Sequence, residues 1–184
     1  LDAIQHIVLE QQSEFNRIWQ NIILELRKEK IFLVTEKKLN REQQKFVVDF
    51  FEEQVRPNVI PLMIESIEQF PYLREKSIYL AVVMARKNSA YKRKYALIEV
   101  PTRAVARFNL LPASKPGEHN IILLEDIIRY NLPRIFSFFE YETFSAHIIK
   151  VTKDAEFDID YDESLSYIDK IEKGIKSRRK GKPV

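Results

Sequence analysis

The fold is decided by residues 77–86, which read SIYLAVVMAR. Both alternating sets of side chains in this stretch are apolar, which is typical of a central strand that is covered on both faces. Residues 95–100 form a second apolar stretch, and the residues between the two stretches are polar and basic. The pattern predicts an antiparallel hairpin with a loop over residues 87–94 and with Pro101 closing the second strand.

The chain before this hairpin predicts a helix, a strand and a second helix. Apolar residues at helical spacing run from Ile4 to Leu26 and predict one long helix that ends near residue 29. A β-branched and aromatic run at residues 31–34 predicts a short buried strand, so a boundary falls near residue 30. Asn40 and Gln43 have the spacing of a capping box, at the start of a helix that Pro57 ends.

The chain after the hairpin contains strands and helices without a strict βαβ order. The pattern predicts strands at 121–124 and 144–151, a helix at 127–136 that Pro133 kinks or restarts, and an amphipathic helix at 164–180. The predicted fold class is therefore α+β, a mixed sheet with packed helices that follows one long α-helix from a helical-bundle domain.

Composition excludes several classes of function. The 184 residues include no cysteine and only three glycines, which excludes thiol nucleophiles, disulfides and the glycine-rich loops that cradle phosphates. A net charge of +3 is too small to indicate a nucleic-acid or membrane partner by itself. No apolar run approaches the roughly 20 residues of a transmembrane helix, so we predict no transmembrane segment. The sequence begins at Leu1 inside an amphipathic pattern, which favours an excised fragment.

Acidic residues and histidines give no metal or catalytic motif. Residues 154–163 contain six acids, but a calcium-binding loop starting at Asp158 needs glycine where Glu163 stands and glutamate where Asp169 stands. Alternation with apolar residues favours a solvated acidic face instead. His6 and the other two histidines lack the spacing of a metal motif. The residues by themselves therefore assign no catalytic, cofactor-binding or metal-binding residue, and cation binding by the acidic stretch stays the minor alternative.

Two basic patches are the candidate binding residues. Arginine presents a planar fork that suits phosphate oxygens, so we take these residues as candidate polyanion contacts: Arg86, Arg93, Arg178, Arg179 and Lys180. The alternative is that the first patch is a solvated turn and that the second holds cations that complement a helix end. Tyrosines flank the first patch, but no RNA-binding signature is present, so no nucleic-acid partner is predicted.

Five motifs in order resemble one family. They are IFL at 31–33 after a long helix, ALIEVP at 96–101, the pair RF at 107–108 with LP at 111–112, ILLEDIIRYNL at 122–132, and VTKDAEFDI at 151–159. Together they resemble the long, bacterial-type polyphosphate kinase, whose members reversibly transfer the terminal phosphate of ATP to inorganic polyphosphate through a phosphohistidine. Pro133 departs from the polar residue that relatives carry there.

The resemblance implies a structural portion of a larger enzyme. Residues 1–30 would be the C-terminal helix of an N-terminal three-helix domain, and residues 31–184 the middle, or head, domain, truncated at its C-terminal end. The catalytic histidines and the groups that bind Mg²⁺ and ATP would lie in the parent outside this chain, which would be inactive alone and would hold no cofactor. The alternative is a stand-alone noncatalytic α+β module that binds an acidic partner or polyanion.

The resemblance also implies partners and a location. The chain would contact other domains of the same protein, contribute dimer contacts to a homo-oligomer, and line a tunnel that holds inorganic polyphosphate. We expect a cytoplasmic protein, with membrane association of the parent left open.

Overall fold

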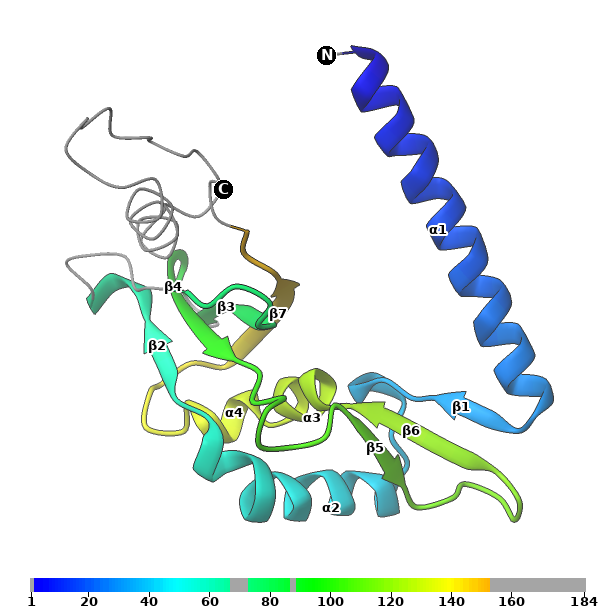
Figure 1. Ribbon diagram of the computed structural model, residues 1–184. Helices are drawn as coiled ribbons and strands as arrows, with labels where there is room; N and C mark the ends of the chain where they lie inside the picture. Colours follow the sequence, from blue (N-terminus) through cyan, green and yellow to red (C-terminus); the bar gives the residue numbers. More distant parts are fainter. Residues whose placement is uncertain (1, 67–72, 87–88, 153–184) are drawn as a thin grey trace, which may run out of the picture. The chain divides into compact units, whose positions relative to one another are not determined.

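The computed structural model describes residues 2–66, 73–86 and 89–152, and these residues form two compact units (Figure 1). Unit 1 takes its described residues from 1–58 and 103–132, and unit 2 from 59–102 and 133–184. Within the described ranges, no helix is long and apolar enough to cross a membrane.

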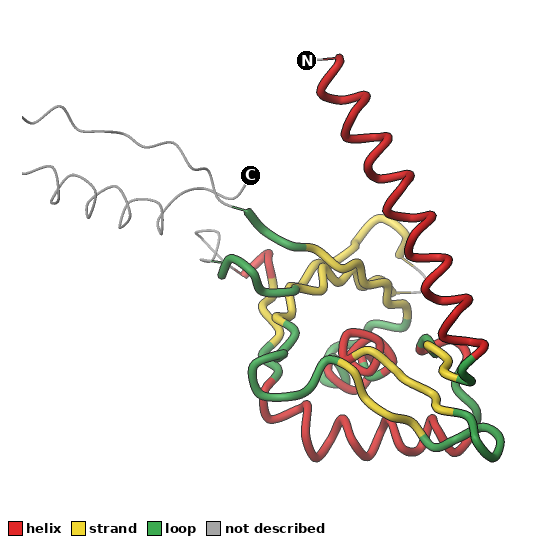
Figure 2. The backbone as a smooth tube through the Cα atoms, turned by 45° about the vertical axis from the view of Figure 1, so that its right-hand side comes forward, coloured by secondary structure: helices red, strands yellow, loops and turns green. Residues whose placement is uncertain are grey.

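Unit 1 begins with the predicted long helix, α1 (Asp2–Lys28). None of its residues is buried, and it contacts β1 at its C-terminal end (Figure 2). Lys30 follows in a left-handed conformation with φ of 60°, and its carbonyl accepts the backbone N–H of His119 at 2.9 Å. The chain thus turns sharply out of the helix and into the first strand.

The sheet of unit 1 has three strands in the order β1-β6-β5. β1 (Ile31–Leu33) runs parallel to β6 (His119–Leu123), and β5 (Phe108–Leu111) pairs antiparallel to the other side of β6. Helix α3 (Leu124–Tyr130) follows β6 directly and buries Leu124, Ile127 and Ile128 completely. These side chains form the centre of the unit 1 core.

Helix α2 (Arg41–Phe50) has the capping box that the sequence predicts. Oδ1 of Asn40 accepts the backbone N–H of Gln43 at 2.9 Å, and Oε1 of Gln43 accepts the N–H of Asn40 at 3.2 Å. The buried Gln43 amide also donates to the carbonyl of Pro112 at 2.9 Å, which ties the helix start to the segment after β5. The helix continues as a π-helical turn, η2 (Phe51–Val55), and ends in η3 (Arg56–Asn58) at the expected proline.

Unit 2 contains a four-stranded antiparallel sheet in the order β2-β4-β3-β7. The strands are β2 (Pro61–Met63), β3 (Tyr79–Arg86), β4 (Ser89–Glu99) and β7 (Thr143–Ile149). In the register, Val82 of the central strand β3 faces Ala96 of β4 and Ala146 of β7. Residues 79–86 are therefore a central strand, as predicted, but only one of its two apolar faces is fully buried among the described residues, whereas cover on both faces was expected.

Several predicted boundaries differ from the structure. The α+β class is confirmed, but the strands form two sheets, one mixed and one antiparallel. β4 begins at Ser89, so most of the predicted loop 87–94 is strand; backbone pairing needs no apolar side chains, and the polar composition concealed it. The predicted helix at 127–136 divides into α3 and α4 (Leu132–Ile135), as Pro133 requires. The predicted helix at 164–180 lies outside the described residues.

Candidate functional site

The sheet of unit 2 has one covered face and a second face, called the open face here, that the described residues cover only in part. Leu80, Val82 and Met84 of β3 are buried on the covered face. Ala81, Val83 and Ala85 alternate with them and are only half-buried. A small cluster of Leu73, Tyr79, Leu97 and Val151 covers one end of this second face, with Ala81 packed against it. On the remaining part of this face, the described side chains are half-buried or exposed.

A shallow pocket of about 550 Å³ lies on the accessible part of this face. Residues of three strands line it: Val83, Ala85 and Arg86 of β3, Arg93 of β4, and Thr143, Phe144, Ser145 and His147 of β7. Two of the predicted polyanion contacts, Arg86 and Arg93, are therefore brought together. Strict alternation would place Arg86 on the covered face beside Met84, but the register shifts between these two residues. Such irregularities re-aim side chains in strands.

The described lining of the pocket contains two arginines and no acidic residue. Nη2 of Arg86 lies 2.9 Å from a carboxylate oxygen of Glu140, and both side chains are exposed to solvent. Arg93 has no ion pair with any residue that the structure describes. The hydroxyl of Thr143 donates to the carbonyl of Ala85 at 3.1 Å, so its hydrogen is already used. The pocket thus holds one arginine in an exposed pair and one arginine without a described acidic partner.

A second group of charged side chains surrounds the start of α3 in unit 1. Nη2 and Nε of Arg107 donate to Oε1 of Glu125 at 2.5 and 3.1 Å, and the Glu125 side chain is completely buried. This hydrogen bond is the largest cause that raises the pKa of Arg107. The carbonyl of Arg107 also accepts the backbone N–H of Leu124 at 2.8 Å. Arg107 therefore fixes the segment before β5 to the start of α3.

The surroundings of Asp126, which lies beside this pair, change its pKa. Burial raises its pKa to about 6, the nearby carboxylates of Glu36 and Glu125 act in the same direction, and Arg129 opposes them. Arg129 forms an ion pair with Asp126 and lies 3.5 Å from Glu36 of η1 (Glu36–Lys38). These contacts join three segments of unit 1, so the arrangement is structural in character.

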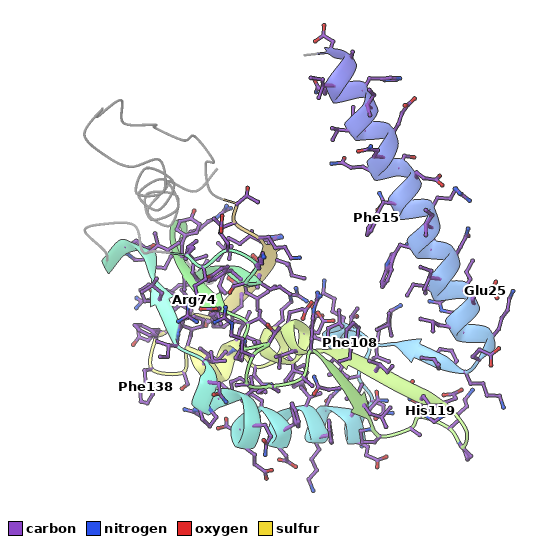
Figure 3. All side chains as sticks on the ribbon, in the orientation of Figure 1. Phe15, Glu25, Arg74, Phe108, His119 and Phe138 are labelled. Atoms are coloured by element: carbon purple, nitrogen blue, oxygen red, sulfur yellow. The ribbon has the colours of Figure 1, made fainter. Side chains whose placement is uncertain are left out.

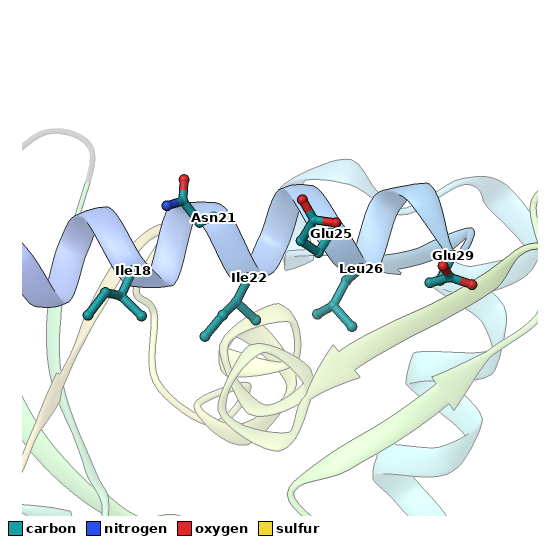
Figure 4. A pocket seen from close by; sticks show the side chains of 6 residues that line it. All are labelled: Ile18, Asn21, Ile22, Glu25, Leu26 and Glu29. Atoms are coloured by element: carbon teal, nitrogen blue, oxygen red, sulfur yellow. The ribbon is translucent and has the colours of Figure 1, made fainter.

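The long helix α1 carries a separate, apolar surface. A shallow pocket of about 390 Å³ is lined by Ile18, Asn21, Ile22, Glu25, Leu26 and Glu29, and Figure 4 shows Ile18, Ile22 and Leu26 pointing to the same side of the helix. Phe15 is 67% exposed on the same helix (Figure 3). The lining offers aliphatic groups, one amide and two carboxylates, which suit packing against another protein surface.

The histidines lie on different elements. His6 is on α1 with Nε2 3.2 Å from Glu10, His119 opens β6, and His147 is in β7. In the described part of the chain, no three histidine or acidic side chains gather as metal ligands. Arg178, Arg179, Lys180 and the acidic stretch 154–163 lie outside the described residues.

Sequence reasoning missed two kinds of residue. Ser145 and His147 line the pocket with the arginines because β7 pairs with β3, and no local pattern revealed that pairing. Arg107 and Glu125 lie within two of the motifs that carry the family resemblance, and no sequence pattern predicts that they pair.

Two sheets with packed helices and a basic open sheet face define this chain as an α+β protein with a candidate anion-binding surface. Residues 42–184 match the family model described as the polyphosphate kinase middle domain. The chain therefore belongs to the polyphosphate kinase family.

Individual relatives agree with the family model. The chain is 35% identical over its whole length to a polyphosphate kinase of Vibrio cholerae serotype O1, covering 26% of that protein, and 33% identical to one of Escherichia coli strain K12, covering 27% of it. The crystal structure of polyphosphate kinase from Porphyromonas gingivalis matches 83% of this chain and 25% of its own, with a TM-score of 0.74 and 29% identity. The chain thus spans about a quarter of the length of these relatives.

Proposed function

We propose that this chain is the middle portion of a protein that reversibly transfers the terminal phosphate of ATP to inorganic polyphosphate through a phosphohistidine. The observation that carries the proposal is similarity over the entire chain to proteins named polyphosphate kinase. Because the chain spans about a quarter of those proteins, most of the machinery would lie in other segments. ATP and Mg²⁺ would be bound there, and this portion would hold no cofactor of its own.

The proposed role of this portion is architectural. Residues 1–30 would form the last helix of an N-terminal three-helix domain, and residues 31–184 the middle domain, with dimer contacts and part of a tunnel wall. The exposed apolar side chains of α1, among them Ile4 and Phe15, support packing against another domain, since a large apolar surface seldom stays in contact with water.

The proposed ligand of the basic surface is polyphosphate. Phosphate contacts by lysine and arginine give affinity that depends on charge and falls with salt. Arg86 and Arg93 share one pocket and support this assignment. Arg178, Arg179 and Lys180 stay predicted contacts on the basis of sequence.

The reaction is tested with two proteins, the 184-residue chain and a longer protein that contains it together with the segments that its relatives have. Each is incubated with Mg²⁺ and ATP labelled in the γ-phosphate, and label in polyphosphate is measured. We expect activity from the longer protein and none from the chain. An inactive longer protein would favour the alternative, a noncatalytic module that binds an acidic partner or polyanion, which the basic pocket also suits.

A further inference from the structure

We propose that the open face of the unit 2 sheet binds a linear oligophosphate through Arg93, Arg86, Ser145 and His147. The inference rests on the proposed function for the identity of the anion, and it adds a defined site with two contacts that the sequence did not indicate. The site is the pocket of about 550 Å³ that strands β3, β4 and β7 line.

The floor of the pocket is made of small side chains. Val83 and Ala85 of the central strand occupy it, so a ligand can approach the sheet closely. Ser145 lies opposite Val83 in the register, and His147 lies opposite Ala81. Two residues apart on one strand, Ser145 and His147 share a face and stand about 7 Å apart along it. This row suits an extended chain of phosphates better than a single phosphate.

The donors are available to a ligand. Ser145 and His147 are exposed, and neither side chain has a hydrogen bond to another residue in the described part of the chain. Arg93 is exposed and has no ion pair with a described residue. A hydroxyl, an imidazole and a guanidinium therefore converge with hydrogens to donate, and charge-assisted bonds to phosphate oxygens are among the strongest that proteins make.

The acidic neighbour of the site is easily displaced. Arg86 is paired with Glu140, whose side chain is 83% exposed. Exposed ion pairs contribute little stability, because water solvates both partners well when they separate. A polyanion with several charges can therefore take the place of one carboxylate, which leaves both arginines facing the ligand.

The described lining of the pocket contains one aromatic ring, and that ring is engaged elsewhere. Phe144 is the aromatic residue of the described lining, and its ring stacks on Phe136 with centroids 6.1 Å apart. Single-stranded nucleic acids are usually held by aromatic rings on which bases stack. Phe144 is already engaged, whereas Tyr95 of β4, which lies opposite Val83 in the register and is 43% exposed, is the ring beside the pocket on which a base could stack.

The histidines make the first test specific. The 184-residue chain contains three histidines, and His147 alone lies in this pocket. The chain is titrated with a polyphosphate of 10 to 20 units while the histidine ring signals are followed by NMR, with His147 assigned from a His147→Gln variant. We expect a saturable shift of the His147 signals and constant signals from His6 and His119. Constant His147 signals would overturn the proposal.

Matched variants make the second test quantitative. Arg93→Glu and Ser145→Asp both place negative charge in the pocket, and Arg134→Glu makes the same charge change as the first at an exposed arginine of α4 outside the lining. With folding checked by thermal unfolding, we expect polyphosphate affinity to fall about tenfold in each pocket variant, the loss of one charge-assisted bond. We expect less than a twofold change in the control.

Equal losses in the pocket variants and in the control would overturn the site, because binding would then follow net charge alone. The proposed reaction is judged separately, by label transfer in the longer protein. If the longer protein is active but the His147 signals of the 184-residue chain do not respond to polyphosphate, this inference is contradicted and the proposed function stands.

Discussion

Arg107 donates Nη2–H to Oε1 of Glu125 at 2.5 Å, and this contact holds a completely buried carboxylate at the start of α3. The two residues belong to different motifs of the family resemblance, the pair at 107–108 and the stretch at 122–132. The contact indicates that these motifs preserve the packing of unit 1. The contact also predicts which substitutions will destabilise unit 1.

Replacing Arg107 with methionine is expected to lower the free energy of unfolding by about 2 to 4 kcal/mol. A buried carboxylate without its partner costs about 3–5 kcal/mol, and the partial exposure of Arg107 reduces the effect. Chemical denaturation followed by circular dichroism measures the change. Arg103→Met, at an exposed arginine in the same connection, is the matched control and should change stability by less than about 0.5 kcal/mol. Equal effects would contradict the role of the pair.

Stability is expected to fall as pH rises from about 4 to 6 because of Asp126. Its pKa is raised to about 6 in the folded chain, chiefly by burial, and is about 3.9 in the unfolded chain. The folded state therefore binds the proton more tightly, and its advantage, about 3 kcal/mol at most, is complete below pH 4 and lost above pH 6. Asp126→Asn removes this group from the titration.

The measurement is the difference in unfolding free energy between the parent chain and Asp126→Asn across pH 4 to 7. Groups that do not interact with Asp126 titrate equally in both proteins and cancel. We expect the difference to shift in favour of the variant as pH rises through this window. A difference that is constant with pH would contradict the raised pKa.

The same substitution at a buried and at an exposed leucine is expected to change stability by different amounts. Leu80→Ala is expected to cost about 2–5 kcal/mol, because Leu80 is completely buried in the central strand and the substitution leaves a cavity. Leu110→Ala makes the same change at a side chain that is 61% exposed in β5, and should cost less than about 1 kcal/mol. Thermal unfolding of both variants checks this order, and similar losses would place the core elsewhere.

The apolar surface of α1 predicts association. Ile4 to Leu26 present large exposed side chains, so the 184-residue chain is expected to self-associate or to bind a neighbouring domain there. Sedimentation at increasing concentration measures the mass. Ile18→Gln together with Ile22→Gln should reduce association, whereas a single monomeric species of the parent chain at high concentration would contradict the prediction.

The sequence predicted features that depend on neighbouring residues well, and strand pairings between distant residues poorly. Asn40 and Gln43 form the expected capping box, and residues 77–86 form the expected central strand, because neighbours along the chain determine both features. The parallel contact of β1 with β6 joins residues almost 90 positions apart, from Ile31 to His119, and no local pattern encodes it. The three-residue β2 is too short for periodicity to reveal.

The candidate site could likewise be predicted only in part. Arginine chemistry predicts Arg86 and Arg93 as polyanion contacts, which stays a prediction, and the pocket that they line also depends on β7 lying beside β3 and on the register shift between Met84 and Arg86. Ser145 and His147 gain significance only through those pairings.

We propose that this portion of the protein contributes architecture and polyphosphate contacts, while the phosphorylated histidine lies elsewhere. The most direct test is to incubate the longer protein with γ-labelled ATP and Mg²⁺, digest it under alkaline conditions that preserve phosphohistidine, and locate the label by mass spectrometry. We expect label on a histidine outside residues 1–184. Label on His6, His119 or His147 that disappears when that residue is changed to glutamine would contradict it.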